Sequence, residues 1–200
     1  MGDGGRVLAF LQGEGVDGRG RTLFEVLAFD DAALERHHDF IQWLFPLNEP
    51  SAAVPDAPVL AEAEVAAIRD STLAQCAMAA ATDRMDRFYR RTDHWLRPHD
   101  HNHLRITRII RSLRLLGGDA AADAFRDAVL WRVEATRSPV SARSRGYWAT
   151  PRAVRRARPP CRPSGGTRSP RTARRRSASG SGRRSVRPGR GLPCPEGAAA

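Results

Sequence analysis

Four histidines close together in one polar stretch are the residues of this chain best suited to chemistry. They are His94, His99, His101 and His103. Imidazole nitrogens bind zinc and nickel, and a helix beginning at Pro98 would place His99 and His103 one turn apart. The spacing of the set matches no established metal motif, so we prefer a polar helix start whose histidines cap, hydrogen-bond or face water. We therefore expect no bound metal, and a metal-binding or hydrolytic site at His94–His103 is the alternative.

A second pair of histidines, His37 and His38, invites a general acid/base interpretation because Glu35 and Asp39 flank it. Adjacent residues of a helix point in different directions, however, so such a pair would need catalytic partners from elsewhere in the fold. The chain also lacks the GxSxG and HExxH motifs and any Cys/His signature of a hydrolase. The sequence thus predicts a protein that is not an enzyme, with no catalytic residues and no cofactor.

One strongly apolar segment, residues 31–47, is the element around which we expect the domain to be organised. As a helix, it places Leu34, His38, Ile41 and Phe45 on one face, by the spacing that a 3.6-residue period requires. Large apolar side chains also fall on its other sides, which is typical of a helix enclosed by its neighbours. The proline near its end should stop the helix.

Gln42 is a polar side chain inside this apolar helix, and a buried carboxamide should be hydrogen-bonded. Its partner is either the backbone of the proline-rich connector at residues 48–58, which we prefer, or a ligand. Neighbouring aromatic side chains would offer further contacts to a ligand if they are exposed. The predicted ligand-binding residues are Gln42, Trp43, Phe45 and Trp95.

Further amphipathic segments predict the rest of a compact all-α domain of about five to seven helices. Expected helices cover residues 59–69, 72–89, 102–116 and 119–134, with shorter apolar pieces at 6–12 and 23–29. In the 102–116 segment, isoleucines and leucines share one face, while Arg105, Arg108, Arg111 and Arg114 follow the opposite side. We expect this arginine face to be solvated or salt-bridged rather than bound to phosphates or acidic lipid.

The excess basic charge of the chain is confined to its last quarter. Residues 1–150 carry a net charge of −2, whereas residues 151–200 contain 14 Arg and one acidic residue, for a net charge of +13. Few apolar side chains and eight prolines predict that this tail is disordered. Such a tail would bind nucleic acid or anionic membranes nonspecifically and in a salt-dependent way. A GC-rich reading frame that shifts or runs past its stop would give the same composition, so a frameshift or read-through origin stays open.

Cysteine usage and hydropathy bear on the compartment of the protein. The three cysteines contain no CxxC pair, so they indicate neither a zinc site nor an even-numbered disulfide framework, and a reducing compartment is the default. No run of about 18 apolar residues could span a bilayer, and the N-terminus lacks the basic and apolar regions of a signal peptide. We therefore expect a cytoplasmic protein without a transmembrane segment.

The segment HDFIQWLFPL, at residues 38–47, resembles the signature of the opioid growth factor receptor conserved region. Weaker likenesses follow the same family order along the chain: FLQGEGVDGRGR, APVLAEAEVAAIR, DRMDRFY, NHLRITRIIRSLRLLGG and SRGYW. Together they extend the resemblance over residues 6–148. The chain is short and contains no lysine, a form that looks like a bacterial member of the family.

Membership of this family would imply a receptor that binds the pentapeptide Met-enkephalin and restrains cell proliferation. It would also imply peripheral association with nuclear and other membranes, because the family has no spanning helix. The long acidic and repeat-containing extension of animal members is absent from this sequence. The resemblance brings no catalytic residues with it. Residues and resemblance together predict a non-enzymatic binding domain whose ligand is an unidentified peptide or protein.

Overall fold

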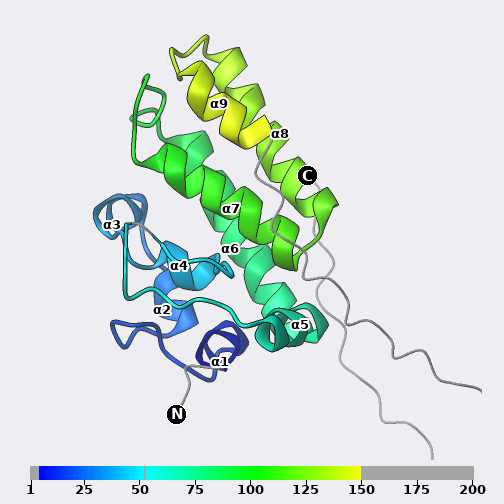
Figure 1. Ribbon diagram of the computed structural model, residues 1–200. Helices are drawn as coiled ribbons and strands as arrows, with labels where there is room; N and C mark the ends of the chain where they lie inside the picture. The colour runs from blue at the N-terminus through cyan, green and yellow to red at the C-terminus, as the bar shows by residue number, and fades with distance from the viewer. Residues whose placement is uncertain (1–4, 52, 150–200) are drawn as a thin grey trace, which may run out of the picture. The chain divides into compact units, whose positions relative to one another are not determined.

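The computed structural model describes residues 5–51 and 53–149, which form helices joined by loops and turns (Figure 1). The nine helices of this part of the chain are α1 (Arg6–Gln12), α2 (Leu23–Leu27), α3 (Asp31–Arg36), α4 (Ile41–Leu44), α5 (Glu62–Asp70), α6 (Thr72–Arg91), α7 (Asn102–Leu116), α8 (Asp119–Ala135) and α9 (Ala142–Ala149). The all-α class expected from the sequence is confirmed. The tail predicted at residues 151–200 lies outside the described residues, so the domain division at residue 150 stays a prediction.

Side-chain caps define where several of these helices begin. Thr22 and Glu25 form a capping box at α2, in which each side chain accepts a hydrogen bond from the backbone N–H of the other residue. Asp30 caps α3 by accepting from the N–H of Ala33 at 2.6 Å, and Ser71 caps α6. The N-terminal helices α1 to α4 have only four to seven residues. Helices of this length are unstable alone, so caps and tertiary packing must stabilise them.

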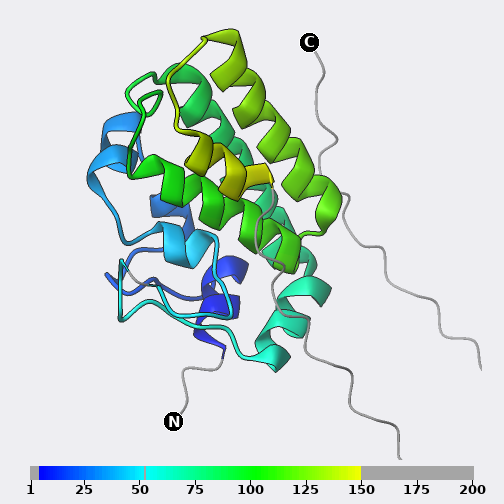
Figure 2. The ribbon, with the colours of Figure 1, turned by 45° about the horizontal axis from the view of Figure 1, so that its top comes forward.

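Three long helices, α6, α7 and α8, form the scaffold on which the shorter helices pack. The chain turns back from α7 to α8 at Gly118, whose φ of 93° is readily adopted only by glycine. α8 packs against both α6 and α7, and α9 lies on α7 and α8 (Figure 2). The short helices α1 to α4 gather beside α6 and α7, and α5 packs on both of these helices (Figures 1 and 2).

One apolar core connects these elements. Its largest fully buried side chains come from the N-terminal helices and the residues flanking α4, from α5 and α6, from the loop before α7 and from α9. The apolar face expected for α7 is confirmed, because its members are at most 4% exposed: Ile106, Ile109, Ile110, Leu113 and Leu116. None of the helices in the described part of the chain is long and apolar enough to cross a membrane.

The long apolar helix that the sequence predicts forms as two short ones, α3 and α4. Between them the backbone of His37 is extended, with φ −88° and ψ 130°. Leu34, Ile41 and Phe45 are buried as expected, whereas His38 is exposed. This break, together with the additional helix α9, raises the number of helices in the described residues above the five to seven that we expected.

Candidate functional site

Arg105 of α7 explains the break between α3 and α4. Its guanidinium is buried and donates hydrogen bonds to the carbonyl oxygens of Leu34 at 2.9 Å and His37 at 2.7 Å. In a continuous helix the Leu34 carbonyl would instead accept from the backbone N–H four residues later. The guanidinium also donates to Oδ1 of Asn102 and to Nδ1 of His38. Burial is the largest cause that holds the pKa of Arg105 below its ordinary value.

Two further side chains of α7 hold the segment that follows α4. Nε of Arg108 donates to the carbonyl oxygen of Phe45 at 2.9 Å, and the Ser112 hydroxyl donates to that of Pro46 at 2.8 Å. These carbonyls have no helical partner because α4 ends just before them. The polar side of α7 therefore replaces the backbone hydrogen bonds that the signature segment cannot make itself.

The prediction that the arginine face of α7 is solvated or salt-bridged is thus only partly correct. Arg111 forms an ion pair with Glu49, and Arg114 with Asp123, as that expectation allows. Burial, however, lowers the pKa of Arg108 to about 10. The face is an internal contact between two parts of the chain rather than a surface open to solvent along its whole length.

The four histidines of the polar stretch do not converge on one point. Nε2 of His94 lies 2.9 Å from Oε2 of Glu35, and Nε2 of His101 lies 3.4 Å from Oε1 of the same carboxylate. His103 instead bonds through Nε2 to a backbone carbonyl, and His99 is exposed. No group of three or more His, Cys, Asp or Glu side chains among the described residues could hold a metal ion. In that part of the chain the histidines therefore provide no ligand set for the alternative metal site, and the alternative hydrolytic role stays a prediction.

Glu35 is the centre of this polar cluster. Besides the two imidazoles, it accepts a hydrogen bond from Nδ2 of Asn102 at 3.1 Å and lies 3.9 Å from the Arg105 guanidinium. Asn102 is completely buried, although it is polar. Burial, followed by the charge of Arg105, keeps the pKa of His101 below its ordinary value. The contacts of Glu35 with Asn102 and Arg105 thus connect α3 to the start of α7.

The predicted ligand-binding residues are buried. They are Gln42, Trp43, Phe45 and Trp95, with exposures of 3, 6, 0 and 0%. When the amide of Gln42 is assigned so that its nitrogen faces the neighbouring carbonyls, this nitrogen donates to those of His38 at 3.2 Å and Asp39 at 3.3 Å. Its partner is therefore the turn before α4 and not the proline-rich connector that we expected. None of the four side chains is exposed, and ligand contact by these residues stays a prediction.

A basic pocket of about 580 Å³ opens beside the turn between α3 and α4. Its lining consists of Arg19, Arg21, Arg36, His37, His38, Asp39 and Val54. The two oxygens of Asp39 accept from Nε of Arg19 at 2.8 Å and from Nη2 of Arg21 at 3.1 Å. Burial alone would raise the pKa of Asp39, but the hydrogen bonds of the two arginines and the charge of Arg21 outweigh it and hold that pKa below its ordinary value. This carboxylate is therefore ionised, and both of its oxygens already accept hydrogen bonds from arginine side chains.

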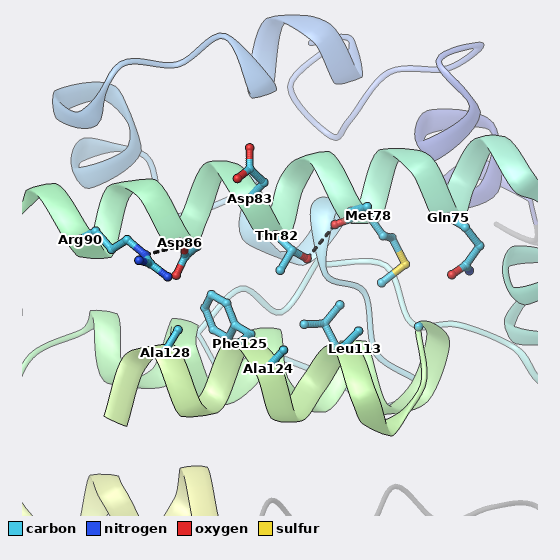
Figure 3. Close-up of a pocket in the computed structure, with 13 residues that line it drawn as sticks. Gln75, Met78, Thr82, Asp83, Asp86, Arg90, Leu113, Ala124, Phe125 and Ala128 are labelled. Carbon is cyan, nitrogen blue, oxygen red and sulfur yellow. Dashed lines mark hydrogen bonds and ion pairs between the residues drawn. The ribbon is translucent and has the colours of Figure 1, made fainter. Parts of the chain in front are cut away.

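A second hollow, of about 530 Å³, is an apolar groove between α6 and α8 (Figure 3). Phe125, Leu113 and Met78 extend into the space between the two helices (Figure 3). The walls carry small side chains that leave this space unfilled: Ala79, Ala121, Ala124 and Ala128. At one end, Asp86 and Arg90 form an ion pair of 2.6 Å. We call this hollow the α6–α8 groove.

Neither hollow was predicted from the sequence. The α6–α8 groove is lined by Ala79 of α6 and by Ala121, Ala124 and Ala128 of α8. The recurrence of alanine every three or four residues in α8 is the only sequence signal of it. The basic pocket takes Arg19 and Arg21 from the loop before α2 and Arg36 from α3, and only the tertiary fold joins them.

The described residues define an all-helical domain with two surface hollows that could receive a ligand. Residues 21–92 match the family model described as the opioid growth factor receptor conserved region. The match includes the signature HDFIQWLFPL, so residues 21–92 are similar to this conserved region, as the resemblance predicted. The matched residues contain helices α2 to α6 and all of the basic pocket lining except Arg19.

Two curated relatives are proteins named opioid growth factor receptor, from Mus musculus and Rattus norvegicus. Each is 37% identical to this chain over 102 residues, which cover 42% of this chain and 16% of the mouse or 17% of the rat protein. The chain thus spans about a sixth of the length of these relatives. No solved structure gives a significant match.

Proposed function

We propose that the domain is a non-enzymatic binding module whose α6–α8 groove receives the apolar side chains of a short peptide, free or within a protein partner. The groove itself is the observation that carries this proposal, because exposed alanines of α6 and α8 leave a hollow whose apolar floor is formed by Met78, Leu113 and Phe125, each at most 3% exposed. Hydrophobic grooves between helices are a recurrent way to bind peptides, with apolar anchors entering the groove.

The size and chemistry of the groove suit a peptide with one or two bulky apolar side chains. Its volume of about 530 Å³ falls within the range of ligand pockets, roughly 300 to 1,000 Å³. Met78 provides a polarizable thioether that adapts to different side chains, and Phe125 provides an aromatic surface. The Asp86–Arg90 pair at the end of the groove offers both a hydrogen-bond acceptor and donors to the peptide backbone or its termini.

The names of the relatives support a polypeptide ligand. The two curated relatives and the matching conserved region are all named for an opioid growth factor receptor. A growth factor receptor binds its ligand and does not transform it, which agrees with a module that is not an enzyme. We extend the binding role to this chain, whereas the identity of the peptide is what the experiment must find.

Methyl NMR spectroscopy of the full chain tests the proposal. The chain has three methionines, of which Met78, 2% exposed, lines the groove, and Met85, 0% exposed, lies outside its lining. Met-enkephalin, and peptides selected on the full chain from a random library, are titrated into protein labelled at the methionine methyl groups. We expect a saturable shift of the Met78 methyl signal, while the signal of Met85 stays in place.

Two alanine substitutions on α8 form a matched pair. Ala124→Leu fills the groove, whereas Ala120→Leu adds the same side chain at an exposed position outside it. Leucine favours helix, so both variants should fold. We expect Ala124→Leu to weaken peptide binding by roughly tenfold or more, about 1.4 kcal/mol, and Ala120→Leu to leave it unchanged. The proposal fails if neither Met-enkephalin nor any selected peptide shifts the Met78 signal, or if both variants bind alike.

A further inference from the structure

The basic pocket presents hydrogen-bond donors without a free acceptor. Both oxygens of Asp39, its lining carboxylate, already accept from Arg19 and Arg21. Nε of Arg21 is also engaged, because it donates to the buried Asp17 at 2.6 Å. The side chain of Arg36 makes no hydrogen bond or ion pair with another described residue. A ligand of this pocket must therefore supply acceptor atoms and negative charge.

His38 adds a donor whose position follows from its neighbour. Its Nδ1 lies 3.0 Å from Nη2 of Arg105. A guanidinium can only donate, so Nδ1 must accept, and the proton of the neutral imidazole then resides on Nε2. Because His38 is exposed and lines the pocket, this Nε2–H is available to a ligand.

The charges of the lining favour an anion. The lining contains three guanidinium groups and only one carboxylate, that of Asp39, so its net charge is positive even when both histidines are neutral. Asp17, which lies behind Arg21, compensates only part of this excess. The groups also approach from different elements, with Arg19 in the loop before α2, Arg36 in α3 and His38 in the turn before α4.

We propose that the basic pocket binds the phosphate group of a phosphate ester, with Arg36, Arg19 and His38 as its donors. Guanidinium groups match the geometry of phosphate oxygens, and their charge strengthens each hydrogen bond. A phosphate offers three terminal acceptor oxygens to donors that come from three directions, whereas a carboxylate offers two oxygens in one plane. This site shares no residue with the α6–α8 groove and does not depend on the peptide-binding proposal.

NMR spectra of the imidazole rings in the full chain test this site directly. All six histidines lie at residues 37, 38, 94, 99, 101 and 103, and the arginine-rich tail contains none. The ring signals therefore report on the pocket even if the tail also binds phosphate. On titration with glycerol 3-phosphate at constant pH, we expect saturable shifts of the His37 and His38 signals. The signal of His99, which is exposed outside the pocket, should stay in place.

Two arginine substitutions with the same change of charge separate the site from general electrostatics. Arg36→Gln removes a lining donor, and Arg97→Gln removes an exposed arginine outside the pocket. Neither residue is buried, so both variants should fold. We expect Arg36→Gln to weaken phosphate binding by roughly tenfold and Arg97→Gln to leave it nearly unchanged.

The source of the phosphate is distinguished by a second set of titrations. A response of His37 and His38 to phosphatidic acid vesicles, but not to phosphatidylcholine vesicles, assigns a lipid headgroup, and a response to glycerol 3-phosphate alone assigns a soluble ester. Either result supports the proposal. Unchanged His37 and His38 signals with every phosphate probe would overturn it. An equal response to succinate at the same ionic strength would do so too, as would equal weakening by the two arginine substitutions.

Discussion

Arg105 stabilises a turn between α3 and α4 where the sequence predicts a continuous helix, and this turn carries functional groups. A buried guanidinium is costly unless its donors are satisfied, and here they reach two carbonyls, an amide oxygen and an imidazole nitrogen. The turn held in this way places His38 and Asp39 at the basic pocket and lets α4 start in a new direction. A single side chain of α7 thus shapes a segment more than 60 residues earlier in the chain.

Replacement of Arg105 by methionine should destabilise the domain strongly. Methionine keeps much of the volume, but the carbonyls of Leu34 and His37 lose their donors in a buried environment. We expect the free energy of unfolding to fall by about 2 to 4 kcal/mol. Urea denaturation measures the loss, with Arg87→Met as the exposed control, which should change stability by no more than about 0.5 kcal/mol. A loss as small as that of the control would contradict the role given to Arg105.

His101 should make the domain less stable in mild acid. Its pKa in the folded state lies below the ordinary value of 6.5, because of burial and the charge of Arg105. Below that ordinary value the unfolded chain takes up a proton that the folded chain does not, so stability falls as the pH falls. His101→Gln should reduce the stability difference between about pH 7.5 and 5.5. In urea titrations the exposed control His99→Gln should keep the full difference, and equal pH dependence in both variants would refute the prediction.

Among the elements, α7 shows what the sequence could predict and what it could not. Its apolar face can be predicted from the spacing of apolar residues within the helix itself, and all five expected residues are buried. Its polar face depends on carbonyls of residues 34, 37, 45 and 46, which lie more than 60 positions away. Local periodicity contains no information about such partners. The same reason explains why α3 and α4 look like one helix in the sequence.

The candidate sites were difficult to predict for a related physical reason. Large apolar side chains such as Trp43, Phe45 and Trp95 have the same pattern whether they fill a core or contact a ligand, and here they fill the core. The need of Gln42 for a hydrogen bond was correctly expected, although its partners are local carbonyls. The groove arises where Ala124 and its neighbours leave space, and an absent side chain gives little signal in a sequence.

Gln42→Leu tests whether α4 depends on its amide. The substitution keeps a similar size but removes the donor to the carbonyls of His38 and Asp39, which hold the turn before α4. We expect a loss of about 1 to 2 kcal/mol, which would lower the melting temperature by several degrees. Calorimetry measures this change, and peptide binding at the groove should persist in the variant. An unchanged melting curve with lost peptide binding would instead assign Gln42 to a ligand.

Over the whole chain, charge divides sharply between residues 1–150, with a net charge of −2, and residues 151–200, with +13. A strongly basic segment binds polyanions mainly by releasing their counterions, whatever its conformation. The near-neutral remainder has no comparable excess for this mode of binding. Nucleic-acid or membrane binding by the full chain is therefore a property to be tested in the tail, separately from the two hollows of the helical domain.

Deletion of residues 151–200 should abolish nonspecific nucleic-acid binding while it leaves the hollows intact. Fluorescence anisotropy with a labelled DNA duplex should show that the affinity of the full chain falls steeply as the salt concentration rises. The logarithm of the binding constant should fall linearly with the logarithm of the salt concentration, with a slope of roughly −0.9 for each phosphate neutralised. The shortened chain should lose this binding, because all 14 Arg of the tail are removed. The methyl signal of Met78 and the ring signal of His38 should respond to peptide and phosphate as before. If all DNA binding persists at physiological salt after deletion, the tail is not the binding element.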